Sequence, residues 1–277
     1  MFWLQGVNVS KKYDVEIDEI DACPVQIQGP LSEDLMAKLA GEELRDVPYY
    51  GILETKVGGA DCVISQTGFT GEKGYEIYVR NAHENAEKMW NAVLEAGEEF
   101  GLMVIAPAHH RRIAAGILSW GQDLDHETSP FQVNLSYQVP RNKAADYIGK
   151  EELEKQRAII DEGKAPFKMK MVGLTLGGKE ITDYAPDFWL VTDTDANEVG
   201  YVTSPWWSPE LETNIALAWV PWESSEVGTK FMVKLPDEYS ESPGVPVDAK
   251  VVDVPFRESV NPNKREVQAS KGLDYAD

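Results

Sequence analysis

The sequence predicts an α+β fold that ends in a small β-barrel or β-sandwich. Apolar residues recur at helical spacing over Ala82–Phe100, Pro107–Trp120 and Glu151–Ile160, and short strand-like runs lie between the amino-terminal helices. From Lys168 onward the pattern changes to short strands separated by turns. That change is typical of a barrel or a sandwich, because each short strand alternates with turn residues.

The change in pattern also predicts the domain organisation. We expect an α+β domain over residues 1–165, a barrel domain over 166–257 and a polar tail over 258–277. The predicted barrel strands are Met169–Leu176, Phe188–Thr192, Val199–Thr203, Ile215–Val220, Lys230–Leu235 and Val247–Val254.

The amino-terminal elements follow from local signals. Phe2-Trp3-Leu4 has the apolar character of a strand interior with no turn before it, which indicates an amino end that begins inside a domain. Gln28-Gly29-Pro30 is a turn, and Ser32 is placed to cap the helix that follows it. Tyr75–Arg80 alternates between apolar and polar residues, which predicts a strand with one buried face.

Composition excludes several classes of partner. Lys plus Arg is 26 and Asp plus Glu is 47, so the net charge is −21. Such an acidic surface repels nucleic acid and anionic membranes, and we expect neither as a partner. The first residues do not resemble a signal peptide, so the expected location is the cytoplasm. Cys23 and Cys62 lie in apolar runs and are expected to be buried free thiols.

The sequence offers no metal site and no nucleophile. Its four histidines contain no pair at the i, i+4 spacing that places two imidazoles on one helical face. The acidic run Asp123–Glu127 lacks the glycine turn of a calcium loop, and we expect a solvated loop there. No Gly-x-Ser-x-Gly motif and no phosphate loop occur.

One glycine-rich loop stands out. Gly68, Gly71 and Gly74 allow positive φ and a close approach of the backbone to a flat ligand. Glu76 follows on the polar face of the strand, where a carboxylate can accept two parallel hydrogen bonds from an amidine-like edge such as that of a pterin. Phe69 at the loop tip could cover the ring. An ordinary surface hairpin with an exposed glutamate is the alternative.

The whole string resembles a known family. Residues 67–77 read TGFTGEKGYEI, which is similar to the TGYTGExGFEI motif of the glycine-cleavage T-protein (aminomethyltransferase) family. Further segments agree with that family in the same order along the chain: Gln26–Pro30, Arg112–Leu118, Asp123–Pro130, Ile148–Glu151, Val199–Ser204 and Ile215–Ala218.

The resemblance implies the carboxy-terminal part of the T-protein folate-binding fold, followed by its barrel. It implies that tetrahydrofolate is the cofactor and that Glu76 binds the pterin edge. Phe69, Gly71 and Tyr75 are the other cofactor-binding residues expected from the motif.

The departures from the family pattern point to a particular branch. Ala108 stands where T-proteins carry an Arg, and Ala114 stands where they carry a Glu. The segments Ala106–Ile113, Gly121–Asp123 and Asp187–Trp189 look closer to the branch that includes dimethylsulfoniopropionate demethylase. Family members also carry a further segment before the Gln-Gly-Pro turn. The resemblance therefore implies that the amino-terminal part is missing, and no residue here is assigned a catalytic role.

The expected reaction is transfer of a methyl group from a small, positively charged methylated donor to tetrahydrofolate. An aromatic pocket would hold such a cation, and Trp120, Trp206 and Trp207 are candidates, with core packing as the alternative. The rival hypotheses are aminomethyl transfer of the glycine-cleavage type and a non-catalytic folate-binding protein. A separate amino-terminal half or a homo-oligomer is the expected macromolecular partner.

Overall fold

The computed structural model describes residues 2–257, which form two compact units. Unit 1 comprises the chain up to Gly68 together with Glu72–Val104, and unit 2 comprises Phe69–Gly71 and the chain from Ile105 onward. The tip of the glycine loop thus belongs to unit 2, although the strands on either side of it belong to unit 1. The domain limits expected from the sequence stay predictions. The expected polar tail, residues 258–277, lies outside the described residues.

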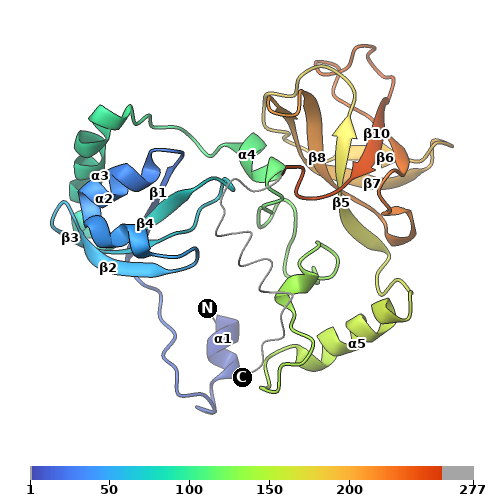
Figure 1. The fold of residues 1–277 in the computed structure, drawn as a ribbon. Coiled ribbons are helices and arrows are strands. Elements are labelled where there is room, and N and C mark those ends of the chain that lie inside the picture. The colour runs from blue at the N-terminus through green and yellow to red at the C-terminus, as the bar shows by residue number, and fades with distance from the viewer. Residues whose placement is uncertain (1, 258–277) are drawn as a thin grey trace. The chain divides into compact units, whose positions relative to one another are not determined.

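Unit 1 is a sheet covered by helices on one face (Figure 1). The four strands pair antiparallel in the order β1-β4-β3-β2. The helices α2 and α3 pack on the sheet, and each ends in or is followed by a 3₁₀ turn, η1 or η2. The elements are β1 (Ala22–Gln28), α2 (Ser32–Ala40), η1 (Glu42–Asp46), β2 (Ile52–Val57), β3 (Ala60–Ser65), β4 (Gly74–Arg80), α3 (Ala82–Gly97) and η2 (Glu98–Phe100).

The alternation in β4 is confirmed. Tyr75, Ile77 and Val79 are fully buried beneath the helices. Glu76 and Tyr78 lie on the opposite face and are only partly buried. Because side chains alternate along a strand, the same residues that build the core fix the direction in which Glu76 points.

Three expectations for the amino-terminal region are wrong. Phe2–Val7 forms a short helix, α1, rather than a strand, and none of its residues is buried. Ser32 is the first residue of α2, and its hydroxyl donates to the Lys73 carbonyl at 3.2 Å instead of capping the helix. Cys23 is exposed because it lies on the edge strand β1, whereas Cys62 is buried as expected.

Unit 2 contains a closed antiparallel barrel with the strand order β10-β5-β8-β7-β6-β9 (Figure 1). Two helices, α4 and α5, precede the barrel. The elements are α4 (His109–Ala114), η3 (Ser136–Gln138), α5 (Lys150–Asp161), β5 (Met169–Leu176), β6 (Trp189–Thr192), β7 (Glu198–Ser208), β8 (Thr213–Pro221), η4 (Trp222–Ser224), β9 (Lys230–Val233) and β10 (Val247–Val252). The predicted barrel is confirmed and each predicted strand is present, but β7 continues to Ser208, five residues beyond its predicted end at Thr203.

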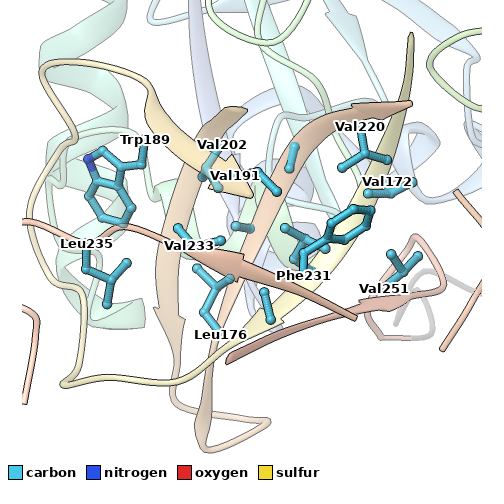
Figure 2. Packing of buried hydrophobic residues seen from close by; sticks show 14 of the residues in the cluster. Val172, Leu176, Trp189, Val191, Val202, Val220, Phe231, Val233, Leu235 and Val251 are labelled. Carbon is cyan, nitrogen blue, oxygen red and sulfur yellow. The ribbon is translucent and has the colours of Figure 1, made fainter. Parts of the chain in front are cut away.

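The barrel interior is filled by branched and aromatic side chains. Figure 2 shows Val191, Val202, Val233 and Phe231 in this core, with Trp189 near one end. Strand β8 is buried on both of its faces. Its inward residues fill the barrel, and Leu217 and Trp219 pack outside it against the region of α4. That double burial explains the continuous apolar run of this strand.

The helix expected over Pro107–Trp120 is much shorter in the structure. Helix α4 ends at Ala114, and Gly116 takes a left-handed φ of +69°. A side chain at Gly116 would bring its Cβ to 2.6 Å from Val254. The chain therefore leaves the helix at this glycine and forms the irregular segment that leads to Asp123. None of the helices within residues 2–257 has both the length and the apolar character needed to cross a membrane.

Candidate functional site

Within the described part of the chain, the Glu76 carboxylate accepts hydrogen bonds at one of its two oxygens only. Strand pairing places it between Gln26 on β1 and Ser65 on β3. Its Oε2 accepts hydrogen bonds from the hydroxyls of Thr67 and of Tyr78, the latter at 3.2 Å. No residue among 2–257 donates to Oε1. A carboxylate offers about four acceptor positions, so roughly half of the capacity of Glu76 is left for a ligand.

Two tyrosines near Glu76 on β4 have different roles. Tyr75 is completely buried in the core of unit 1, and its hydroxyl accepts a hydrogen bond from Gln66 at 3.3 Å. Tyr78 lies on the same face as Glu76. Burial, followed by the charge of Glu76 and the hydrogen bond to it, raises the pKa of Tyr78, so this phenol stays a donor at neutral pH. Tyr75 supports the strand, and Tyr78 orients the carboxylate.

The glycines of the loop leave space that other side chains of the same chain occupy. A Cβ at Gly68 or at Gly74 would lie within 2.5 Å of the Gln28 side chain. At Gly71, where φ is +73°, a Cβ would lie 2.3 Å from the Cβ of Ala115. Gln28 donates from Nε2 to the Thr67 carbonyl at 3.3 Å. The glycines therefore have a packing reason in the folded chain, and the expected role of Gly71 beside a ligand stays a prediction.

Unit 2 contains a buried ion pair that the sequence did not reveal. The guanidinium of Arg112 lies 2.8 Å from Asp123, and both side chains are essentially inaccessible to solvent. Asp123 accepts from Arg112 and from the Ser119 amide at Oδ2, and from the hydroxyls of Thr203 and Ser204 at Oδ1. The expectation of a solvated loop at Asp123 is wrong, because all of its acceptor positions are filled inside the protein.

Further donors of Arg112 bind the residues around it. The guanidinium donates to the Ile117 carbonyl at 3.1 Å, to Ser204 at 2.8 Å and to Gln122 at 3.2 Å. Its Nε donates to Nδ1 of His109 at 3.3 Å. The ring of Phe69 lies 5.9 Å from the guanidinium carbon, within cation–π range. Arg112 thus ties the loop tip, α4 and strand β7 together within unit 2.

Aromatic side chains surround His109 in unit 2. The imidazole stacks on Trp206 with ring centres 5.5 Å apart, and its contact with Tyr184 is edge-on at 4.8 Å. The Tyr184 hydroxyl donates to Gln122 at 2.6 Å. Trp206, a sequence candidate for donor binding, therefore belongs to this aromatic group, whereas Trp120 is 68% exposed. The donor-binding role of both tryptophans stays a prediction.

Sequence reasoning assigned no site role to Asp123, His109, Gln122 or Tyr184. An adjacent pair of histidines on a short helix carries no spacing signal, and Tyr184 lies in the irregular loop between β5 and β6. A signal that could have pointed to the network is Arg112 itself at the start of an apolar run, because a buried Arg needs a nearby acid. Within residues 2–257, no three His, Cys, Asp or Glu side chains gather as metal ligands.

The chain is similar to known proteins over most of its length. The model of the GCVT N-terminal domain matches residues 1–143, and that of the glycine cleavage T-protein C-terminal barrel domain matches residues 170–257. An aminomethyltransferase of Caldanaerobacter subterraneus is 31% identical over 88% of this chain and 61% of the relative. A dimethylsulfoniopropionate demethylase of Ruegeria pomeroyi is 32% identical over 84% of this chain and 60% of the relative.

A solved structure has the same fold. The glycine cleavage system aminomethyltransferase T from Bartonella henselae superposes with a TM-score of 0.65 at 22% identity, over 86% of this chain and 60% of that one. The chain thus spans about three fifths of the length of these relatives. Since the two family models together match most of the described residues, the chain belongs to the glycine-cleavage T-protein family.

Proposed function

We propose that this chain binds tetrahydrofolate through Glu76 and takes part in the transfer of a methyl group from a small, dimethylsulfoniopropionate-like donor to it. The observation that carries the proposal is the state of the Glu76 carboxylate. One oxygen is fixed by Thr67 and Tyr78, and the other is left without a donor among residues 2–257. A fixed but half-satisfied carboxylate is suited to a flat ligand edge that presents N–H donors.

The residues around Glu76 fit such a ligand. The 2-amino-pyrimidinone edge of a pterin carries the donors that a carboxylate accepts, and Glu76 is partly buried, which strengthens a charge-assisted hydrogen bond. Tyr78 holds the carboxylate in place from the same strand. When bound, tetrahydrofolate supplies the nucleophilic nitrogen that accepts the one-carbon group. The protein's own part is to orient the ring through Glu76.

Methyl transfer is favoured over aminomethyl transfer by the residues at the two ends of α4. Ala108 precedes the first helical residue, and Ala114 is buried in the core outside the barrel. Neither side chain can supply the charge that the T-protein pattern has there. The identities of 31% to an aminomethyltransferase and 32% to a demethylase do not separate the two reactions.

The binding claim is tested by calorimetric titration of tetrahydrofolate into the Glu76→Ala variant. We expect at least a tenfold loss of affinity, about 1.4 kcal/mol, because a charge-assisted pair is removed. Glu87→Ala is the matched control, since Glu87 is an exposed acid on α3, on the other side of the sheet. Equal affinities for Glu76→Ala and the unsubstituted chain would remove Glu76 from the site.

The reaction claim needs a separate assay. The chain is incubated with tetrahydrofolate and either dimethylsulfoniopropionate or an aminomethylated lipoyl carrier, and the folate product is identified by mass spectrometry. A methylated folate formed from the sulfonium donor supports the proposal. A methylene folate formed only with the carrier would favour aminomethyl transfer. Tight folate binding with neither product would favour a non-catalytic folate-binding protein.

A further inference from the structure

His109 lies where its two ring nitrogens must play different roles. The Nε–H of Arg112 can only donate, so the nitrogen that it meets at 3.3 Å, Nδ1, must carry a lone pair. A neutral imidazole with a bare Nδ1 carries its proton on Nε2. No residue among 2–257 forms a hydrogen bond with Nε2. The structure therefore presents Nε2–H as a donor that no protein group uses.

This arrangement makes His109 a poor proton acceptor near neutral pH. Nδ1 could take up a proton only by losing its bond to Arg112, and Nε2 already holds one. Burial, and after it the charge of Arg112, lowers the pKa of His109, while Asp123 opposes the shift in part. The titratable groups that face the imidazole are Arg112 on α4, Asp123 in the following loop and Tyr184 before β6. The ring is a fixed, neutral donor.

The surroundings of His109 complete a small site. Trp206 covers one face of the imidazole and Tyr184 meets it edge-on, so the ring cannot turn without breaking both contacts. The Arg112 guanidinium behind Nδ1 polarises the ring and makes Nε2–H a stronger donor. A donor of this kind forms its strongest hydrogen bond with a charged oxygen. In a chain of net charge −21, an anion needs such a local donor to be held.

We propose that His109 is a ligand-binding residue whose Nε2–H binds a carboxylate, with Trp206 and Tyr184 beside the rest of the ligand. This inference rests on the proposed function for its choice of ligands, because both the methylated donor and the glutamyl tail of tetrahydrofolate carry a carboxylate. The donor is small enough for its onium group to reach the aromatic rings from the same site.

Binding is tested by nuclear magnetic resonance of the ¹⁵N-histidine-labelled chain, titrated with dimethylsulfoniopropionate and with its methyl ester. We expect His109 to be protonated on Nε2 alone at pH 7, its Nε2–H signal to shift with the acid, and the ester to bind at least tenfold more weakly. A second arm compares tetrahydrofolate with its glutamyl diester, in which both carboxylates of the tail are blocked. A His109 shift in that arm alone would assign the carboxylate to folate. A doubly protonated ring, or no His109 shift with any of the four ligands, would overturn the inference.

Two variants separate binding from structure. His109→Gln keeps an acceptor for Arg112 and an N–H donor, whereas His109→Phe keeps the ring contacts and loses both polar functions. We expect His109→Phe to raise the dissociation constant or the KM of the carboxylate ligand at least tenfold and His109→Gln to raise it less than threefold. Equal effects of the two variants would contradict the inference. Methyl transfer with an unchanged KM in His109→Phe would refute this inference alone. His109-dependent binding without methyl transfer would refute the proposed reaction alone.

Discussion

Asp123 in unit 2 and Glu76 in unit 1 are two carboxylates with opposite degrees of satisfaction. Asp123 is 1% exposed and accepts from Arg112, Ser119, Thr203 and Ser204. Glu76 is partly buried and accepts at one oxygen only. A saturated buried carboxylate can bind nothing more and holds its unit together, whereas a fixed carboxylate with a spare oxygen is prepared for a ligand.

The largest expected effect comes from breaking the saturated pair. Asp123→Ala leaves the Arg112 guanidinium buried without its counter-charge, and we expect a loss of about 3–5 kcal/mol in the stability of unit 2. Urea unfolding followed by the fluorescence of the barrel tryptophans measures it. Arg141→Ala, which breaks an ion pair exposed to solvent, is the control and should leave the unfolding midpoint nearly unchanged. An Asp123→Ala variant as stable as this control would show that the network does not hold unit 2 together.

The sequence predicted helices and strands better than the buried hydrogen-bond network around Asp123. The alternation of Tyr75–Arg80 has a period of two residues and is visible locally, so the direction of Glu76 could be predicted. The burial of Asp123 could not, because it depends on Thr203 and Ser204, which lie some 80 residues further along the chain. The acidic residues next to Asp123 in the sequence predicted a side chain exposed to solvent. Asp123 is buried because of contacts with residues that are distant in the sequence.

The glycine loop shows the same limit. The sequence pointed to positive φ at Gly68, Gly71 and Gly74, of which Gly71 alone adopts it, and it could not show that the missing side chain of Gly71 makes room for Ala115. The family resemblance supplied the fold and the T-protein assignment, since residues 67–77 and the barrel strands are recognisable as strings. It gave His109 no role of its own, because the surroundings of His109 depend on Trp206 and Tyr184.

A second, intermediate effect is expected at Gly71. Gly71→Ala must adopt a left-handed φ, which costs about 1–2 kcal/mol, and must also displace Ala115, which adds roughly 1–3 kcal/mol. Gly121→Ala is the matched control, because Gly121 has a φ of +82° with nothing within 4 Å of the added Cβ. Thermal unfolding of both variants isolates the packing contribution. Equal losses would mean that the contact with Ala115 relaxes without cost.

A smaller effect is expected from pH. The pKa of His109 is lowered in the folded chain, chiefly by burial and then by Arg112. The unfolded chain therefore binds a proton near the ordinary histidine pKa of about 6.5, and the folded chain does so only at lower pH. Stability is complete above that value and falls as the pH drops through the folded pKa, by at most about 1.4 kcal/mol per pH unit for one proton.

This pH dependence is measured by urea unfolding between pH 8 and pH 5. His109→Gln carries no titrating ring, so we expect its stability to fall less steeply over that range than that of the unsubstituted chain. The difference between the two slopes isolates the contribution of His109. Parallel slopes would show that His109 titrates equally in the folded and unfolded chains.

The contrast between the two carboxylates is tested most directly by the stabilisation that tetrahydrofolate gives to Glu76→Gln. In the absence of ligand, this variant should unfold like the unsubstituted chain, because Gln keeps the volume and an acceptor oxygen for Thr67 and Tyr78. Tetrahydrofolate is added at about 100 times its dissociation constant for the unsubstituted chain. At that concentration it should stabilise the unsubstituted chain by about 2.7 kcal/mol. If Glu76→Gln binds it tenfold more weakly, the same concentration should stabilise the variant by only about 1.4 kcal/mol. Equal stabilisation of both chains would contradict the assignment of Glu76 to the folate site.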